Sequence, residues 1–223
     1  MIIKDLGLID YREALQIQEN LFNQAIQQQK NQEKTTDYLL FCEHQPVFTI
    51  GRSGKLSNLL IDTETMDRLN ISLYNISRGG DITFHGPGQL VVYPIINLKH
   101  YGIYASEYVS KIEETIIQTL KEFNIKSDRL KGATGVWLDA TRLESARKIC
   151  AIGVKVSRWI TMHGLALNVN TELNYFNYIN PCGFTDKGVS SIEKEIGERV
   201  DMTKVKEIFA QKFNTLFGQN VIN

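Results

Sequence analysis

Apolar residues recur with helical spacing in several parts of the chain. Between Tyr11 and Ile26 they fall mostly on one face of a helix, and the polar run QQQKNQEK that follows is expected to form the helix end and a solvated loop. The clearest helix is Ala105–Phe123, where apolar residues repeat every three or four positions, as in an amphipathic helix that covers a sheet. A short helix over Thr63–Leu69 and a closing helix over Thr203–Phe217 complete the helical prediction.

Extended segments are predicted where aliphatic and aromatic residues run together between turn-forming residues. YLLFCEHQPVFTIG bends at Pro46, so a strand is expected before the proline and a second extended piece after it. ISLYNIS and LVVYPIINL are expected to be strands on either side of RGGDITFHGPGQ. TGVWLDA, RKICAIGVKV and WITMHGLALNVN follow, the last two joined by a hairpin turn at Ser157–Arg158. Because no repeat or long linker divides the chain, we expect residues 1–223 to form one α+β domain.

Composition narrows the class of protein. The chain has 25 basic and 25 acidic residues, which argues against general binding to nucleic acid or membranes. No apolar run approaches the roughly 20 residues of a membrane span, and the N-terminus lacks the pattern of a signal peptide. Cys42, Cys150 and Cys182 lie far apart and form no CxxC pair, which is typical of a cytoplasmic protein without disulfides. No cluster has metal-ligand spacing, so no metal site is expected.

RGGDITFHGPGQ, residues 78–89, is the most unusual stretch of the sequence. It matches neither the GxxxxGK[ST] phosphate loop nor the GxGxxG dinucleotide motif. Its four glycines would let a ligand approach the backbone closely, while Arg78 could hold a charged or carbonyl-bearing group and His85 could orient or protonate one. The alternative is structural, with Gly-Pro-Gly as a hairpin turn and His85 as a hydrogen-bonded residue at its edge.

Reactive side chains elsewhere also allow two interpretations each. Cys42 and Cys150 lie in apolar runs typical of packing residues, whereas Cys182 lies in the loop sequence NPCGF and is a candidate nucleophile. Lys148 is either a strand-end lysine that reaches solvent or a group near a thiol, where it acts as an ammonium that lowers the thiol pKa or as a base. His163 either bonds to backbone at a strand start or frames a cleft together with His85.

Taken together, six stretches resemble one family, the lipoyl(octanoyl) transferases. RGGDITFHGPGQLVVYP is similar to the family signature nearly residue for residue. HQPVFTIGRSG lies upstream of it, and TGVWL, KICAIGVKVSRW, TMHGLALNV and NPCGF follow in the family's order and spacing. The likeness runs from about Tyr38 to Cys182. It implies the fold of the biotin/lipoate protein ligases, an α/β domain with a mixed sheet flanked by helices.

The resemblance also implies a reaction and the residues that perform it. An octanoyl group would pass from acyl carrier protein to Cys182 as a thioester, with Lys148 activating the thiol, and then to a lysine of a lipoyl domain. This is the first step of endogenous lipoate synthesis, and it needs no cofactor. The implied partners include the lipoyl domains of 2-oxoacid dehydrogenases and the glycine cleavage H protein, and a monomer is expected. His163 would support the site, and the positions that match substrate-contacting segments are Arg78, Gly79, Gly80, Asp81, Ile82, Thr83, Phe84, His85, Ala151, Ile152, Gly153, Gly164, Leu165 and Ala166.

Two other functions fit the same fold. An ATP-dependent lipoate-protein ligase would need a nucleotide pocket and commonly an accessory C-terminal domain, whereas this chain ends one helix after its last motif. It would also have no need of the loop cysteine. A binding module that only docks acyl carriers would have no need of both Lys148 and Cys182. The sequence therefore favours the transferase over both.

Overall fold

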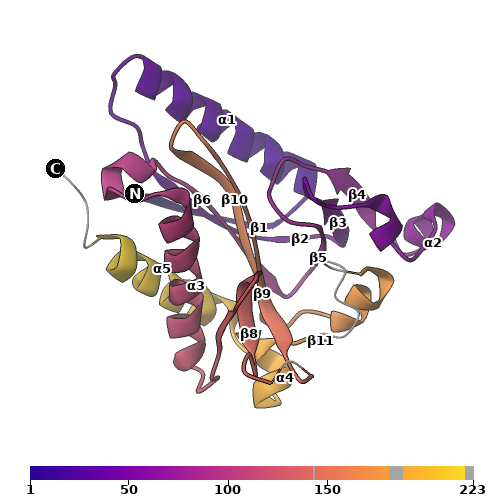
Figure 1. Ribbon diagram of the computed structural model, residues 1–223. Helices are drawn as coiled ribbons and strands as arrows, with labels where there is room; N and C mark the ends of the chain where they lie inside the picture. The colour runs from indigo at the N-terminus through magenta and orange to yellow at the C-terminus, as the bar shows by residue number, and fades with distance from the viewer. Residues whose placement is uncertain (143, 181–187, 219–223) are drawn as a thin grey trace.

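The computed structural model describes residues 1–142, 144–180 and 188–218, which form a larger and a smaller β-sheet with helices packed around them (Figure 1). The larger sheet follows the order β1–β2–β6–β10–β9–β8–β7, and β11 pairs with β9. Its strands β1–β2 and β9–β11 are parallel and the others antiparallel, which confirms the mixed sheet. The bounds of these strands are β1 Ile2–Ile9, β2 Tyr38–His44, β6 Gln89–Ile95, β7 Asp128–Leu130, β8 Ala133–Leu138, β9 Arg147–Ser157, β10 Ile160–Asn168 and β11 Gly188–Val189.

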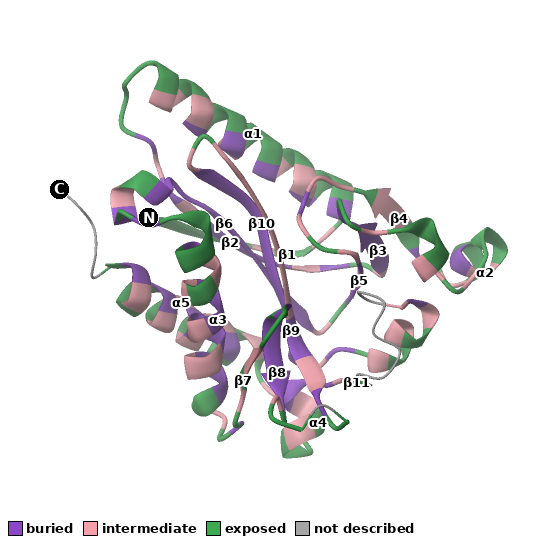
Figure 2. Ribbon diagram, in the orientation of Figure 1, coloured by how far each residue is buried: buried purple, intermediate pink, exposed green. Residues whose placement is uncertain are grey.

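Helices cover both faces of the larger sheet (Figures 1 and 2). On β2, Leu40 and Cys42 pack toward helix α1 (Tyr11–Lys30). Leu39 and Phe41 belong to the core that helices α3 (Ala105–Lys121) and α5 (Met202–Gly218) cover. This two-sided burial explains why the strands read as continuous apolar runs rather than as an alternating pattern. The other helices and 3-10 turns are α2 Thr63–Arg68, α4 Ile192–Ile196, η1 Leu56–Asn58, η2 Leu98–Tyr101 and η3 Leu173–Tyr178.

The predicted helices are confirmed. The first helix ends at Lys30, so the first four residues of QQQKNQEK form the predicted helix end and the other four lie beyond it. Asp10 caps its start by accepting hydrogen bonds from the backbone N–H groups of Arg12 and Glu13. None of the described helices is long and apolar enough to cross a membrane.

Strand β1 has no counterpart among the predicted elements. It lies at the edge of the sheet, and its apolar residues Ile2, Ile3 and Leu8 are between 44% and 54% exposed. An edge strand with few buried side chains shows neither the alternation nor the apolar run by which a strand is recognised. Its pairing with β2 is a tertiary contact that the local sequence does not show.

The hairpin of β9 and β10 forms as predicted, but its turn is shifted by one residue. Ser157 pairs with Ile160, so the two turn residues are Arg158 and Trp159 rather than Ser157–Arg158. Both have positive φ angles, 52° and 71°, the conformation of a type I′ turn. The backbone twist of a type I′ turn matches the right-handed twist of the flanking strands. This match stabilises the turn although neither residue is the glycine or asparagine that such turns prefer.

The smaller sheet separates segments that are adjacent in sequence. It has the order β4–β3–β5, with β3 Val47–Ile50, β4 Ser72–Asn75 and β5 Ile82–His85. The bend at Pro46 therefore passes the chain from one sheet to the other, and Gly-Pro-Gly returns it from β5 to β6 instead of closing a hairpin. Gly88 has a φ of +80°, and a Cβ there would lie 2.3 Å from the Asn170 carbonyl oxygen, so the return requires glycine.

Candidate active site

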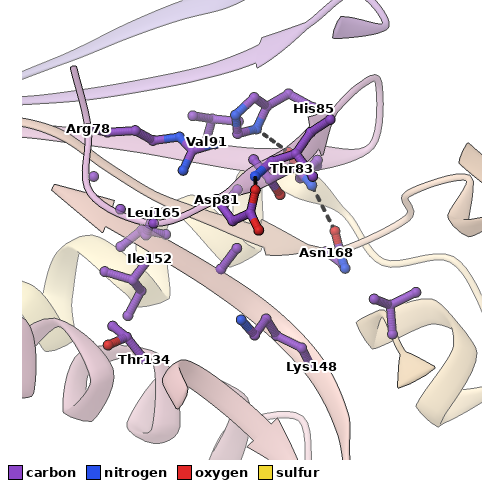
Figure 3. A pocket seen from close by; sticks show the side chains of 18 of the residues that line it. Arg78, Asp81, Thr83, His85, Val91, Thr134, Lys148, Ile152, Leu165 and Asn168 are labelled. Carbon is purple, nitrogen blue, oxygen red and sulfur yellow. Dashed lines mark hydrogen bonds between the residues drawn. The ribbon is translucent and has the colours of Figure 1, made fainter. Parts of the chain in front are cut away.

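A cavity of about 360 Å³ lies where the β9–β10 hairpin faces the loop before β5 (Figure 3). Its size and its largely apolar walls with a few polar groups are typical of a small-ligand site. Gly79 and Phe84 are not part of its lining, and Cys182 lies outside the described residues. The predicted site residues that do line the cavity are Arg78, Gly80, Asp81, Ile82, Thr83, His85, Lys148, Ala151, Ile152, Gly153, His163, Gly164, Leu165 and Ala166.

Small residues on the hairpin make room for the cavity. Gly164 pairs with Gly153, and Ala166 pairs with Ala151. Since side chains alternate along a strand, these four residues lie on one face of the hairpin. On this face Ala166 packs into the core beneath α1. Two neighbouring cross-strand pairs without large side chains leave a hollow that an elongated apolar group could fill.

Hydrogen bonds from Arg78 and Gly79 fasten the loop above this hollow to both sheets. Arg78 Nη2 donates to the Thr49 carbonyl oxygen at 2.6 Å and to Thr49 Oγ1 at 2.9 Å, which ties the loop to β3. On the other side, Gly79 N–H donates to the Val154 carbonyl oxygen at 3.0 Å, which ties it to β9. A Cβ on Gly153 would lie 2.8 Å from the Gly79 carbonyl oxygen and 2.9 Å from Arg78 Cδ, so the approach of loop and strand requires glycine.

Buried hydrogen bonds fix the orientation of His85. Its Nδ1 lies 2.8 Å from Oε1 of Gln89, whose Nε2 donates to Oδ1 of Asn168 at 2.9 Å. The Gln89 oxygen can only accept, so His85 carries its proton on Nδ1 and its Nε2 accepts from Thr49 Oγ1 at 3.4 Å. Asn168 in turn donates to the Ser190 carbonyl oxygen. The donors therefore run in one direction from Arg78 through these side chains to Ser190.

Both histidines of the cavity are electrically neutral at physiological pH. Burial, followed by the charge of nearby groups, lowers the pKa of His85 to about 3 and that of His163 to about 3. A neutral His85 therefore has no extra proton to give to a ligand at this pH. His163 is also strained, because its φ is +60° within strand β10, and its Nδ1 is buried without a hydrogen-bond partner.

Lys148 lies in the middle of the three strands that close one side of the cavity. It is in register with Trp137 on β8 and with Val189 on β11. Its Nζ lies 4.7 Å from the centre of the Trp137 ring, a cation–π contact. Lys148 thus directs its amine into the cavity (Figure 3), and the residue is half-buried.

The two described cysteines are packing residues. Cys42 and Cys150 are both fully buried, and burial raises the pKa of each thiol well above its ordinary value. Neither belongs to the cavity lining. The prediction that both fill the core is therefore confirmed.

Several lining residues were not predicted as part of a site. Gln89 and Trp137 lie within the motifs RGGDITFHGPGQ and TGVWL. Their positions in these motifs could therefore have identified them as site residues. Tyr11, at the start of α1, reaches the cavity only through the fold and stacks on His85 at 6.1 Å between ring centres. Others in this group are Val91, Tyr93, Gly132, Ala133, Thr134, Asn168, Phe176, Gly188 and Val189.

Known proteins resemble this chain in both sequence and fold. In sequence, the protein-family model described as the lipoyl protein ligase A/B catalytic domain matches residues 10–214 of this chain. An octanoyltransferase of Parabacteroides distasonis is 50% identical over 214 residues, which cover 96% of this chain and 97% of the relative.

Two solved structures match in fold at low identity. A bipartite lipoate protein ligase from Thermoplasma acidophilum has a TM-score of 0.73 at 14% identity, covering 97% of this chain and 83% of the other. The biotin protein ligase of Aquifex aeolicus has a TM-score of 0.58 at 13% identity, covering 99% and 72%. The predicted biotin/lipoate ligase fold is thereby confirmed.

Proposed function

Because this chain belongs to the lipoyl protein ligase A/B catalytic domain family, and within it to the octanoyltransferases, we propose that it transfers octanoyl groups through a thioester on Cys182. The observation that carries this proposal is the position of Lys148, whose amine reaches a cavity floored by two pairs of small residues. A cationic amine beside a thiol favours the thiolate, which is the reactive nucleophile.

The described residues on either side of segment 181–187 lie at or near the cavity, which supports the proposed pairing of Cys182 with Lys148. Before it, Asn180 N–H donates to the Asn58 carbonyl oxygen at 2.8 Å. After it, Gly188 and Val189 line the cavity, and Val189 is in register with Lys148. Both buried cysteines lie outside the cavity lining, so neither competes for the role of nucleophile.

The reaction divides into two transfers. The Cys182 thiolate attacks the octanoyl thioester of a carrier protein, the carrier thiolate leaves, and one thioester replaces another at nearly equal free energy. A lysine amine of a lipoyl domain then attacks the acyl-enzyme, and formation of the amide drives the sequence forward. Covalent catalysis of this kind gives ping-pong kinetics. Neither ATP nor a metal takes part, because the thioester is already activated.

We also propose the partners of the protein, its oligomeric state, its cellular location and its step in lipoate synthesis. The donor is octanoyl-acyl carrier protein, and the acceptors are the lipoyl domains of 2-oxoacid dehydrogenases and the glycine cleavage H protein. The protein acts as a monomer in the cytoplasm, at the first step of endogenous lipoate synthesis. Membership among the octanoyltransferases counts against an ATP-dependent ligase and against a binding module without activity.

Intact-mass spectrometry after mixing the protein with octanoyl-acyl carrier protein, without ATP, tests the proposal. We expect one octanoyl adduct that disappears when a lipoyl domain is added. Cys182→Ala should abolish the adduct, while the matched variant Cys150→Ala should retain it. An adduct on Cys150, or an undiminished adduct in Cys182→Ala, would refute the role of Cys182.

A further inference from the structure

Asp81 is the only carboxylate among the described residues that line the cavity. It projects from the loop before β5, while Lys148 projects from β9 on the opposite wall (Figure 3). Its Oδ1 accepts the Ile82 backbone N–H at 2.6 Å, and its Oδ2 accepts Nδ2 of Asn58 at 2.6 Å. Two hydrogen bonds from separate segments therefore hold the carboxylate in one orientation at the cavity wall.

The charges around the cavity make this carboxylate significant. The other charged groups in the described lining are the cations Arg78 and Lys148, since both histidines are neutral. A thioester and an acyl chain carry no charge, so the donor half of the reaction has no use for an anion there. A lysine of the acceptor, however, arrives as an ammonium, and like charges at close range disfavour its approach. Asp81 is the described group that can offset this repulsion.

We propose that Asp81 binds the ε-ammonium of the acceptor lysine and directs it toward the acyl-enzyme, an inference that rests on the proposed function. Each carboxylate oxygen has a lone pair left after its hydrogen bond to Ile82 or Asn58, so either can accept from the ammonium. Asp81 favours the ammonium form, whereas Lys148 on the opposite wall disfavours it, and the bound group loses one proton to water before it attacks.

The transfer step then balances without any further reactant. The neutral amine attacks the thioester carbonyl carbon, the carbon–nitrogen bond forms, and the carbon–sulfur bond breaks. The amine keeps one hydrogen as the amide N–H, and its other hydrogen ends on the released thiol. Asp81 is unchanged by the step, so its contribution is confined to binding and orienting the acceptor.

The test separates the two half-reactions with Asp81→Asn, which keeps the shape of the side chain and removes its charge. Single-turnover rates are measured by intact mass for acylation by octanoyl-acyl carrier protein, for discharge by a lipoyl domain, and for discharge by hydroxylamine, an uncharged nucleophile. Asp67→Asn, at an exposed position on α2, removes one negative charge away from the cavity and is the matched control. Asn58→Ala keeps the Asp81 charge but removes one of its hydrogen bonds.

Because a hydrogen bond to a charged group contributes more than a neutral one, we expect Asp81→Asn to slow discharge by the lipoyl domain about 10- to 100-fold. Acylation and discharge by hydroxylamine should stay within about twofold of the unsubstituted protein, and Asn58→Ala should show a smaller, equally selective loss.

Equal discharge by the lipoyl domain in Asp81→Asn and the unsubstituted protein would overturn the inference. So would an equal slowing of all three reactions, which would mark Asp81 as a structural residue. Absence of an acyl-enzyme in the unsubstituted protein is a different result, because it would overturn the proposed function itself.

Discussion

Gly153→Ala is a small substitution at the closest approach between the hairpin and the loop before β5. The added methyl group would lie 2.8 Å from the Gly79 carbonyl oxygen and 2.9 Å from Arg78 Cδ, closer than such atoms pack in proteins. The loop must therefore move away from β9, and the Gly79–Val154 hydrogen bond of 3.0 Å is stretched or lost.

The expected cost follows from these contacts. Overpacking of this kind costs about 1–3 kcal/mol, and a lost backbone hydrogen bond costs about 1 kcal/mol. Replacing glycine also reduces the conformational entropy of the unfolded chain, which stabilises the folded state by about 0.4–1 kcal/mol. We therefore expect a net loss of about 1–4 kcal/mol in the free energy of unfolding, measured by urea denaturation, together with slower octanoyl transfer because the cavity wall has moved.

Gly79→Ala provides the matched control for this prediction. It adds a methyl group at the same junction, but its nearest neighbour is the Val154 carbonyl oxygen at 3.4 Å, an ordinary contact. Its unfolding midpoint should lie close to that of the unsubstituted protein. If Gly153→Ala and Gly79→Ala unfold at the same urea concentration, the close packing of loop on strand does not limit stability, and the reasoning is wrong.

Three further predictions concern the site and the core. Lys148→Ala should slow acylation of Cys182 and move its pH dependence upward, because a nearby cation lowers a thiol pKa; an unchanged pH–rate profile would show that Lys148 does not tune the thiol. The folded-state pKa values of His85 and His163 are lowered to about 3 from 6.5, so below pH 6.5 the unfolded state binds more protons. Each should then reduce the free energy of unfolding by up to roughly 1 kcal/mol per pH unit as the pH falls from 6.5 toward 3, and equal urea midpoints at pH 7 and pH 5 would contradict this. Phe213→Ala, which removes a fully buried ring stacked on its neighbour in α5, should cost about 3–5 kcal/mol in the same assay, and a loss under 1 kcal/mol would show that the helix packs loosely.

Much of the fold could be predicted because its strands and helices carry strong local signals. Ala105–Phe123 and the strand segments between Thr134 and Asn170 are apolar in patterns that allow few other structures. Strand β1 could not be predicted, because its side chains are mostly exposed and only its pairing with β2 makes it a strand. The division of the strands between two sheets is likewise a tertiary property, since a bend at Pro46 predicts a turn and not its direction.

The motifs predicted most residues of the cavity lining, but they did not show why these residues come to line it. Ala151, Gly153, Gly164 and Ala166 came from a resemblance, whereas the structure shows that they form two cross-strand pairs on one face. Tyr11 lies far from every motif in sequence, and the packing of α1 brings it to His85. Contacts between distant segments depend on the whole fold, so no local pattern could have included it.

His163 has a consequence for how stable this chain can become. A left-handed backbone at a non-glycine residue costs about 1–3 kcal/mol, and here it coincides with a buried nitrogen that has no partner. A laboratory selection for heat resistance alone should therefore favour glycine at position 163, since glycine adopts this conformation without steric cost. Such a selection would remodel the cavity wall as a side effect, so thermostability and activity are best selected together in engineering this protein.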